Sequence, residues 1–120
     1  MTVTLRYVAI AGGGVIGAAI RWGVGEVVET GGFPWATFVV NVVGAALLAW
    51  VSATALEPTV GAALGTGFCG GLTTFSTYSV EIVELIDDGR SGVAVLYGAS
   101  SLIMALAAFV TVRLVMESDR

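Results

Sequence analysis

The segment from Gly67 to Tyr78 has the composition of a polar site inside a membrane helix. Its sequence, GFCGGLTTFSTY, places two adjacent glycines and a run of threonine, serine and tyrosine hydroxyls inside a long apolar stretch. Backbone groups freed at membrane depth must find partners within the protein, so an interrupted helix occurs there only where it is buried in protein or lines a polar path. The segment therefore predicts a broken membrane helix and a site that handles ions or small solutes.

Asn41 is the second residue that could do chemistry at membrane depth. It lies in the middle of an apolar stretch, and Thr37 precedes it by one helical turn on the same face. An amide buried in hydrocarbon needs hydrogen-bond partners, and its nitrogen offers two N–H donors. Two interpretations stay open for Asn41, a clamp between helices and a donor that lines a pore.

Charged side chains near the ends of apolar stretches also have two interpretations. Arg21 either extends to the membrane interface or attracts anions at a vestibule. Glu81 and Glu84, three residues apart, either mark a solvated helix end or offer a vestibule partner to a cation.

Hydroxyls and aromatic rings recur at helical spacing further along the chain. Tyr97 and Ser101 are four residues apart, and Phe75 and Tyr78 are three apart. Serines commonly bond to their own helix and aromatic pairs commonly pack, but a ring has a positive edge that can receive an anion. Amides, hydroxyls, ring edges and one arginine are all donors, which suits a small anion. Carbonyls freed near Gly70 are the exception, since they could hold a cation.

The composition identifies the elements that must position these residues as membrane helices. The 120 residues are 57% hydrophobic and 12% charged, with a mean hydropathy of +0.95, whereas soluble domains carry about 25% charged residues. The lone Cys69 permits no intrachain disulfide and is expected to serve packing, and the absence of histidine argues against a zinc or haem site. The first apolar run is too long for a signal peptide and is expected to remain a membrane span.

Four windows are long enough to cross a bilayer, which takes about 20 mostly apolar residues. They form a single four-helix membrane domain over residues 1–120, with spans at 7–28, 35–55, 60–86 and 92–115. Short connections place both termini on one side. Arg6, Arg113 and Arg120 lie towards the terminal side and Arg90 in an opposite loop, a bias of three to one towards a cytoplasmic terminal side that specifies orientation weakly.

Glycine pairs at GxxxG spacing predict close packing between these spans. The pairs are Gly13/Gly17, Gly61/Gly65 and Gly67/Gly71. Four short spans enclose little interior volume, so we expect an oligomer.

Four motifs, in order, resemble those of the Fluc (CrcB-type) fluoride channel family over nearly the whole chain. They are Gly13-Gly14-x-x-Gly17-Ala18-x-x-Arg21, Thr37-x-x-x-Asn41-x-x-Gly44, the GFCGGLTTFSTY segment, and Tyr97-x-x-x-Ser101. The fold class implied is an all-α integral membrane protein of four transmembrane helices, with the third helix broken mid-membrane, that forms an antiparallel (dual-topology) dimer with two fluoride pathways.

The resemblance also implies roles for individual residues. A structural sodium ion (Na⁺) would be held at the dimer centre by the backbone carbonyls of Gly70 and Thr73, and Arg21 matches the family's first-helix arginine, expected at a vestibule. The positions that match the ion pathway are Asn41, Phe75, Tyr78, Thr37, Tyr97 and Ser101. Tyr78 stands where the family usually has phenylalanine, and its phenol adds a donor.

The implied function is a passive, fluoride-selective ion channel, not an enzyme, that exports fluoride from the cytoplasm as a multi-pass protein of the cell (plasma) membrane. The expected partners are fluoride, sodium, membrane lipid and a second subunit, identical or a paralogue, and nucleic acid is not among them. One alternative is a pathway-deficient partner subunit of a heterodimeric channel. Another is a small proton-coupled multidrug exporter, which would need a carboxylate deep in the first span.

Overall fold

The computed structural model describes residues 2–28 and 31–120, and these residues form helices joined by short connections. In chain order the helices are α1 (Thr2–Val27), α2 (Trp35–Ala53), α3 (Pro58–Ala62), the π-helical segment η1 (Ala63–Cys69), α4 (Gly70–Leu72), α5 (Phe75–Asp87) and α6 (Ser91–Ser118). The all-helical architecture agrees with the prediction from the sequence.

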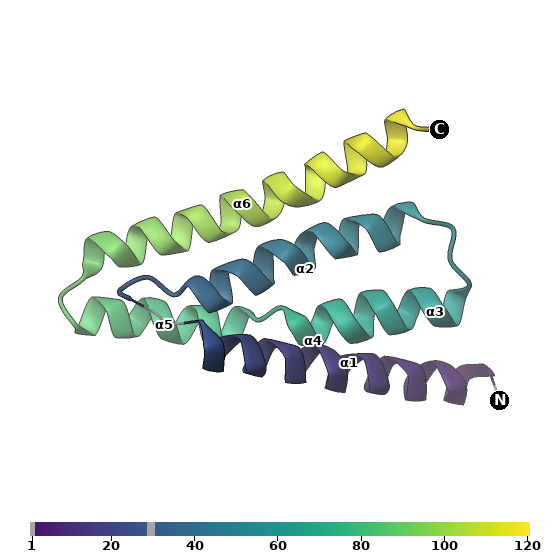
Figure 1. Ribbon diagram of the computed structural model, residues 1–120, viewed down its shortest axis with the longest axis horizontal. Coiled ribbons are helices and arrows are strands. Elements are labelled where there is room, and N and C mark those ends of the chain that lie inside the picture. The colour runs from purple at the N-terminus through teal and green to yellow at the C-terminus, as the bar shows by residue number, and fades with distance from the viewer. Residues whose placement is uncertain (1, 29–30) are drawn as a thin grey trace.

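The helices lie along one long direction, and the chain traverses the molecule four times (Figure 1). The third traverse is made of α3, η1, α4 and α5 in line, with α1 beside it and α2 and α6 paired on the other side (Figure 1). Both termini lie at one end (Figure 1). α1, α2 and α6 are each long and apolar enough to cross a membrane, and the third traverse is divided into shorter helices.

The third traverse is interrupted at Thr73 and Thr74. α4 ends at Leu72, the next two residues are extended, with ψ of 156° and 126°, and α5 begins at Phe75. Gly70 itself is helical, with φ −63° and ψ −36°. The interruption follows from capping, because the Thr74 hydroxyl accepts the Thr77 N–H at 3.1 Å and starts a new helix.

Glycines let the backbones of α1 and the third traverse come into direct contact. A Cβ added to Gly17 would lie 2.2 Å from the Phe68 carbonyl oxygen, and one added to Gly71 would lie 2.3 Å from that of Gly14. Gly13 and Gly67 are equally restricted by backbone atoms, of Ala63 and Ile10 respectively. These two GxxxG pairs therefore pack against each other, as their spacing predicted. The third pair, Gly61/Gly65, has only side chains at 3.5 Å or more as neighbours.

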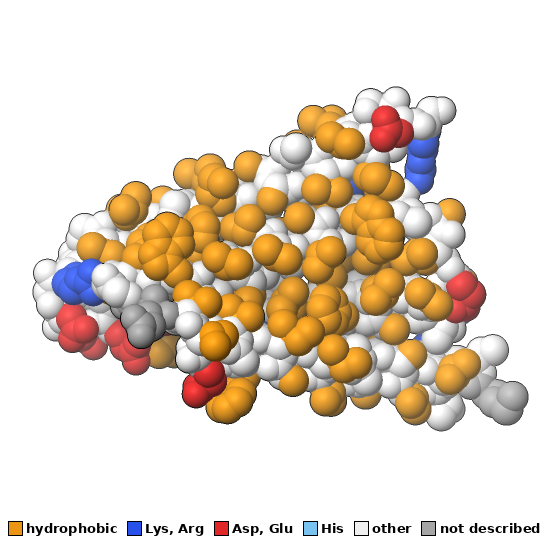
Figure 2. All heavy atoms as spheres, in the orientation of Figure 1, with side chains coloured by type: hydrophobic (Ala, Val, Ile, Leu, Met, Phe, Trp, Pro, Cys, Tyr) orange, Lys and Arg blue, Asp and Glu red, His pale blue; other side chains and the backbone are white. Residues whose placement is uncertain are grey.

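The outer surface matches a lipid environment. In the view of Figure 2, apolar side chains cover the middle of the molecule and charged side chains gather at its two ends. Exposed aromatic residues mark the same two levels, with Trp22 and Trp35 towards one end and Tyr7 and Trp50 towards the other. Fifteen positions separate the two aromatic residues of α1 and likewise those of α2, about 22 Å along a helix. This pattern is typical of aromatic belts at two membrane interfaces.

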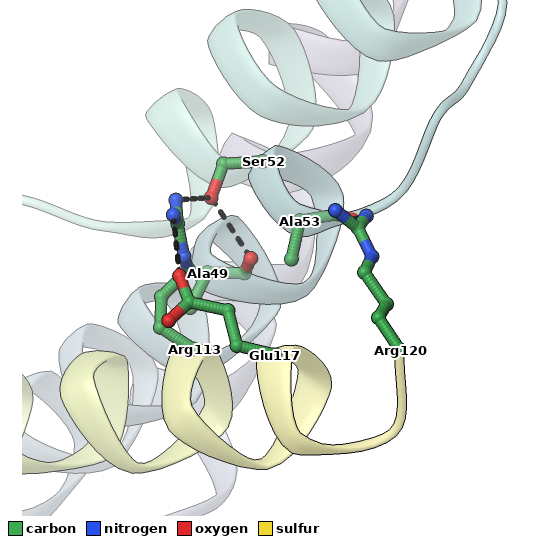
Figure 3. Close-up of polar contacts among 6 residues, drawn as sticks. All are labelled: Ala49, Ser52, Ala53, Arg113, Glu117 and Arg120. Carbon is green, nitrogen blue, oxygen red and sulfur yellow. Dashed lines mark hydrogen bonds and ion pairs between the residues drawn. The ribbon is translucent and has the colours of Figure 1, made fainter.

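The C-terminal ends of α2 and α6 are joined by arginines (Figure 3). Arg113 bonds to Glu117 at 3.0 Å and to the Ser52 hydroxyl at 3.4 Å, and Arg120 donates to the carbonyl of Ala53. Cationic groups are favoured beside the free carbonyls at a helix C-terminus. Two of the terminal-side arginines are therefore held against the end of α2.

Candidate ion pathway and cation site

The side chain of Asn41 joins α2 to the interruption in the third traverse. Its Oδ1 accepts the Thr74 N–H at 2.7 Å, and its Nδ2 donates to the Thr74 carbonyl oxygen at 3.0 Å. Both backbone groups of an extended residue are thereby satisfied by one amide. The clamp interpretation of Asn41 thus describes its bonds, and one of its two N–H donors has no part in the clamp.

A cavity of about 240 Å³ lies beside this clamp, between α2, α5 and α6. Its lining residues are Asn41, Thr73, Thr74, Phe75, Tyr78, Ser101, Leu102 and Ala105. Ser101 is 4% exposed, and its buried hydroxyl has no partner among the described residues. A buried hydroxyl without a partner costs free energy unless a ligand or water supplies one. The cavity therefore has an unused polar group together with an amide and two aromatic rings.

The two aromatic residues of the cavity have different surroundings. Phe75 is 74% exposed in the single protomer, whereas Tyr78 is 8% exposed. Their ring centroids are 5.5 Å apart. The Tyr78 hydroxyl donates to the Gly98 carbonyl oxygen of α6 at 2.8 Å, so the extra phenol donor is used within the protein.

Glu81 brings together two of the predicted pathway hydroxyls. Its carboxylate accepts the Thr37 hydroxyl at 2.8 Å and the Tyr97 hydroxyl at 2.6 Å. Tyr97 is completely buried. A carboxylate with two hydroxyl donors forms strong charge-assisted bonds. The sequence analysis weighed Glu81 only as a solvated helix end or a partner for a cation, and its spacing to Thr37 and Tyr97, on other helices, gave no signal of this contact.

Arg21 lies beside the interruption. Its Nε donates to the Gly71 carbonyl oxygen at 3.0 Å. It also lines a cavity of about 290 Å³ with Trp22, Gly25, Glu26, Ala36, Thr37, Val40, Thr74, Thr77 and Glu81. The arginine therefore donates to a carbonyl of α4 and also lines a polar cavity.

Several carbonyls at the interruption lose their ordinary helical donors, among them those of Gly70 and Thr73. The Thr74 N–H, which would serve Gly70, bonds to Asn41, and the Thr77 N–H, which would serve Thr73, bonds to the Thr74 hydroxyl. Gly70 is exposed, and a Cβ added to it would meet nothing within 4 Å. Backbone oxygens released in this way suit a hard cation.

The predicted pathway residues therefore form two neighbouring groups. Asn41, Phe75, Tyr78 and Ser101 line the cavity beside the clamp. Thr37 and Tyr97 meet at Glu81. The Tyr78 and Tyr97 rings connect the groups, with centroids 5.4 Å apart.

Comparison with known proteins gives matches over most of the chain. A family model described as "CrcB-like protein, Camphor Resistance (CrcB)" matches residues 8–112. The chain is 44% identical over 110 residues to "Fluoride-specific ion channel FluC 2" of Geobacillus kaustophilus, covering 85% of each chain. It is 45% identical over 109 residues to the protein of the same name from Rhodococcus jostii, covering 90% of this chain and 92% of that one. A third relative of that name, from Bacillus subtilis, is 43% identical over 104 residues.

Proposed function

The chain belongs to the CrcB-like family, and on that premise we propose that it is a fluoride-selective ion channel, a multi-pass membrane protein that lets fluoride leave the cytoplasm. The function is transport and not enzymatic catalysis. The observation that carries the proposal is the buried Ser101 hydroxyl, unpartnered among the described residues, in a cavity shared with the Asn41 amide and two aromatic rings. Fluoride is small and strongly hydrated, so several donors must replace its water together.

The chemistry supports passive movement. Intramembrane proton coupling requires a titratable group in the path. The carboxylate nearest the pathway, Glu81, holds two hydroxyls by hydrogen bonds. Moving one charge through the membrane potential releases about 2.3 kcal/mol per 100 mV, and a negative cell interior therefore drives an anion outwards. No energy source beyond that potential is needed.

The pathway assignment follows the two groups of residues. Asn41, Ser101, Phe75 and Tyr78 form the proposed central part of the path. Thr37 and Tyr97, whose O–H groups are both bonded to Glu81, form the wall of the next part. Arg21 would attract anions at the vestibule, since its guanidinium lines the hollow that reaches Thr37 and Glu81.

A sodium ion fits the carbonyls at the interruption. Gly70 and Thr73 would hold it, because the N–H groups that would serve them in a helix bond elsewhere. The Arg21 guanidinium already serves Gly71, which leaves that carbonyl out of the proposed set. A bound cation would stabilise the interruption electrostatically, and it takes no part in moving fluoride.

The assembly we propose is an antiparallel dimer. In it the third traverse is interrupted at mid-membrane, and the interruption lies near the two-fold axis. Phe75 and Gly70 are both exposed in the protomer, which supports a subunit contact at the surface that carries them. A two-fold contact uses the same surface of both subunits, so two protomers would bring four carbonyls together. The second subunit would be a copy of this chain or a paralogue.

The alternative functions are not favoured. A proton-coupled exporter needs a carboxylate deep in α1, where the acidic residue of the described helix, Glu26, lies close to its end. A pathway-deficient subunit would be expected to lack donors, whereas Asn41 and Ser101 both line the cavity.

Growth on fluoride tests the function in cells. Expression of this chain in bacteria that lack their own fluoride export should restore growth at a fluoride concentration that stops the parent strain. Asn41→Asp, expressed to the same level, should fail to do so, because a carboxylate replaces the N–H donors. Equal growth with and without the chain would contradict the proposed function.

A further inference from the structure

Tyr78 is fixed by a bond that its neighbour Phe75 cannot make. Its hydroxyl donates to the Gly98 carbonyl oxygen at 2.8 Å, and the side chain is buried. We propose that this hydrogen bond holds the Tyr78 ring in one position in the cavity and thereby limits the rate of ion passage. The proposal rests on the fluoride pathway proposed above and assigns the phenol oxygen a positioning role.

The geometry defines which motion the bond prevents. The hydroxyl lies on the axis of the ring, so a flip of the ring about that axis leaves the bond intact. A change of the χ1 rotamer swings the hydroxyl away from α6 and breaks the bond. The ring is also packed between two others, with centroids 5.5 Å from Phe75 and 5.4 Å from Tyr97. Tyr78 is therefore the fixed ring of the cavity, and Phe75 is the exposed one.

The surroundings of Gly98 do not restrict the contact. A Cβ on this residue would lie 3.4 Å from the Tyr78 hydroxyl oxygen, which is ordinary van der Waals contact, and 3.3 Å from Cδ1 at the flexible end of Ile82. The bond to the Gly98 carbonyl oxygen therefore does not depend on the absence of a side chain at position 98.

The bond also decides whether the phenol serves the anion. A hydroxyl has one O–H donor, and here the donor is directed to Gly98. To donate to fluoride, Tyr78 would have to leave that carbonyl. The ring consequently contributes a fixed wall and no donor, and any ring movement that ion passage requires must first break a neutral hydrogen bond. Such a bond corresponds to about a fivefold change in rate.

The test is Tyr78→Phe in the full-length chain in liposomes, which removes only the hydroxyl. The maximal rate of fluoride release should rise about fivefold, as expected for the loss of one neutral hydrogen bond. The half-saturating fluoride concentration and the preference for fluoride over chloride should not change, because no anion donor has been lost. Tyr7→Phe, which removes an exposed phenol on α1, should leave all three quantities unchanged.

An equal or lower rate in Tyr78→Phe would overturn the proposal, and a weaker apparent affinity would show that the phenol donates to fluoride instead. Failure of the unmodified chain to release fluoride would instead contradict the proposed function.

Discussion

Single side chains hold the interruption in place, and their partners lie on other helices. Asn41 satisfies both backbone groups of Thr74, and Glu81 accepts hydroxyls from Thr37 and Tyr97. Clamping and donation to an anion are therefore compatible for Asn41, because the second N–H of its amide is not needed by Thr74. Glu81 holds both hydroxyls on its own carboxylate.

Asn41→Asp keeps the size of the side chain and removes its donors. We expect fluoride flux to fall by at least tenfold, about 1.4 kcal/mol on the barrier, since a carboxylate oxygen would face the Thr74 carbonyl and the ion path. The measurement is fluoride release from liposomes, with the dimer checked by size-exclusion chromatography. Ser79→Ala, which removes a hydroxyl bonded to its own helix, is the control. Unchanged flux in the aspartate variant would leave Asn41 a clamp only.

Glu81→Gln removes the charge and one of two acceptor oxygens. One of the two hydroxyls then loses its acceptor, and we expect the protein to be destabilised by about 1.5–3 kcal/mol, the value of a hydrogen bond to a charged group, as measured by thermal unfolding in detergent. Glu84→Gln makes the same charge change at an exposed position one turn away and should have little effect. Equal melting temperatures for Glu81→Gln and Glu84→Gln would contradict this role of Glu81.

The sequence predicted the types of these residues better than their contacts. Donors on the second, third and fourth spans were recognised because polar groups in apolar windows are unusual. Which acceptor each donor finds depends on helix register and rotation, which neighbouring residues do not encode. For this reason the sequence did not predict that Glu81 accepts these hydroxyls, since Thr37 is 44 positions away along the chain.

At the scale of elements, the third traverse and α1 form one closely packed pair. The two elements lie close together because glycines, which have no side chain, allow their backbones to touch. The sequence predicted close packing for three glycine pairs, and two of them make backbone contacts. It placed the break near the glycine pair, whereas the chain leaves the helix at Thr73 and Thr74, because Thr74 caps the next helix. A glycine pair can continue a helix, so the capping threonine was the better signal.

Gly17→Ala tests this packing, with Gly12→Ala as its matched control on the same helix. A Cβ at position 17 would lie 2.2 Å from the Phe68 carbonyl oxygen, whereas one at position 12 meets nothing within 4 Å. We expect Gly17→Ala to destabilise by about 1–3 kcal/mol or more, and Gly12→Ala to be neutral or stabilising by up to about 1 kcal/mol. Thermal unfolding in detergent provides the comparison. Equal melting temperatures for the two variants would contradict the close contact.

At the scale of the whole molecule, the arginine pattern predicts orientation only weakly. Charged groups lie at both ends, and two of the terminal-side arginines, Arg113 and Arg120, are engaged with α2 (Figure 3). The sequence predicted the helical membrane architecture well, because hydropathy directly reflects transfer into lipid. It could not predict which surface of the protomer contacts a second subunit, because an exposed apolar residue such as Phe75 suits lipid and a partner equally well.

Cysteine accessibility measures the orientation. Cys69 is replaced by serine, and a single cysteine is placed at the exposed Ser118. If the chain acts alone as an antiparallel dimer, an impermeant thiol reagent should label about half of the chains from outside, since both orientations are needed. If a paralogue is the partner, the arginine bias should keep the termini inside and labelling should be close to zero. Nearly complete labelling from outside would contradict both forms of the assembly.

Fluoride release from liposomes tests the central claim most directly. Purified protein is reconstituted with potassium fluoride inside, and a potassium ionophore is added to balance charge. We expect rapid fluoride release that depends on the protein and on the ionophore, and no comparable release from liposomes loaded with chloride, because the cavity holds donors for a small anion and no coupling group. Equal release of chloride, or fluoride release that requires a proton gradient, would contradict a passive fluoride-selective channel.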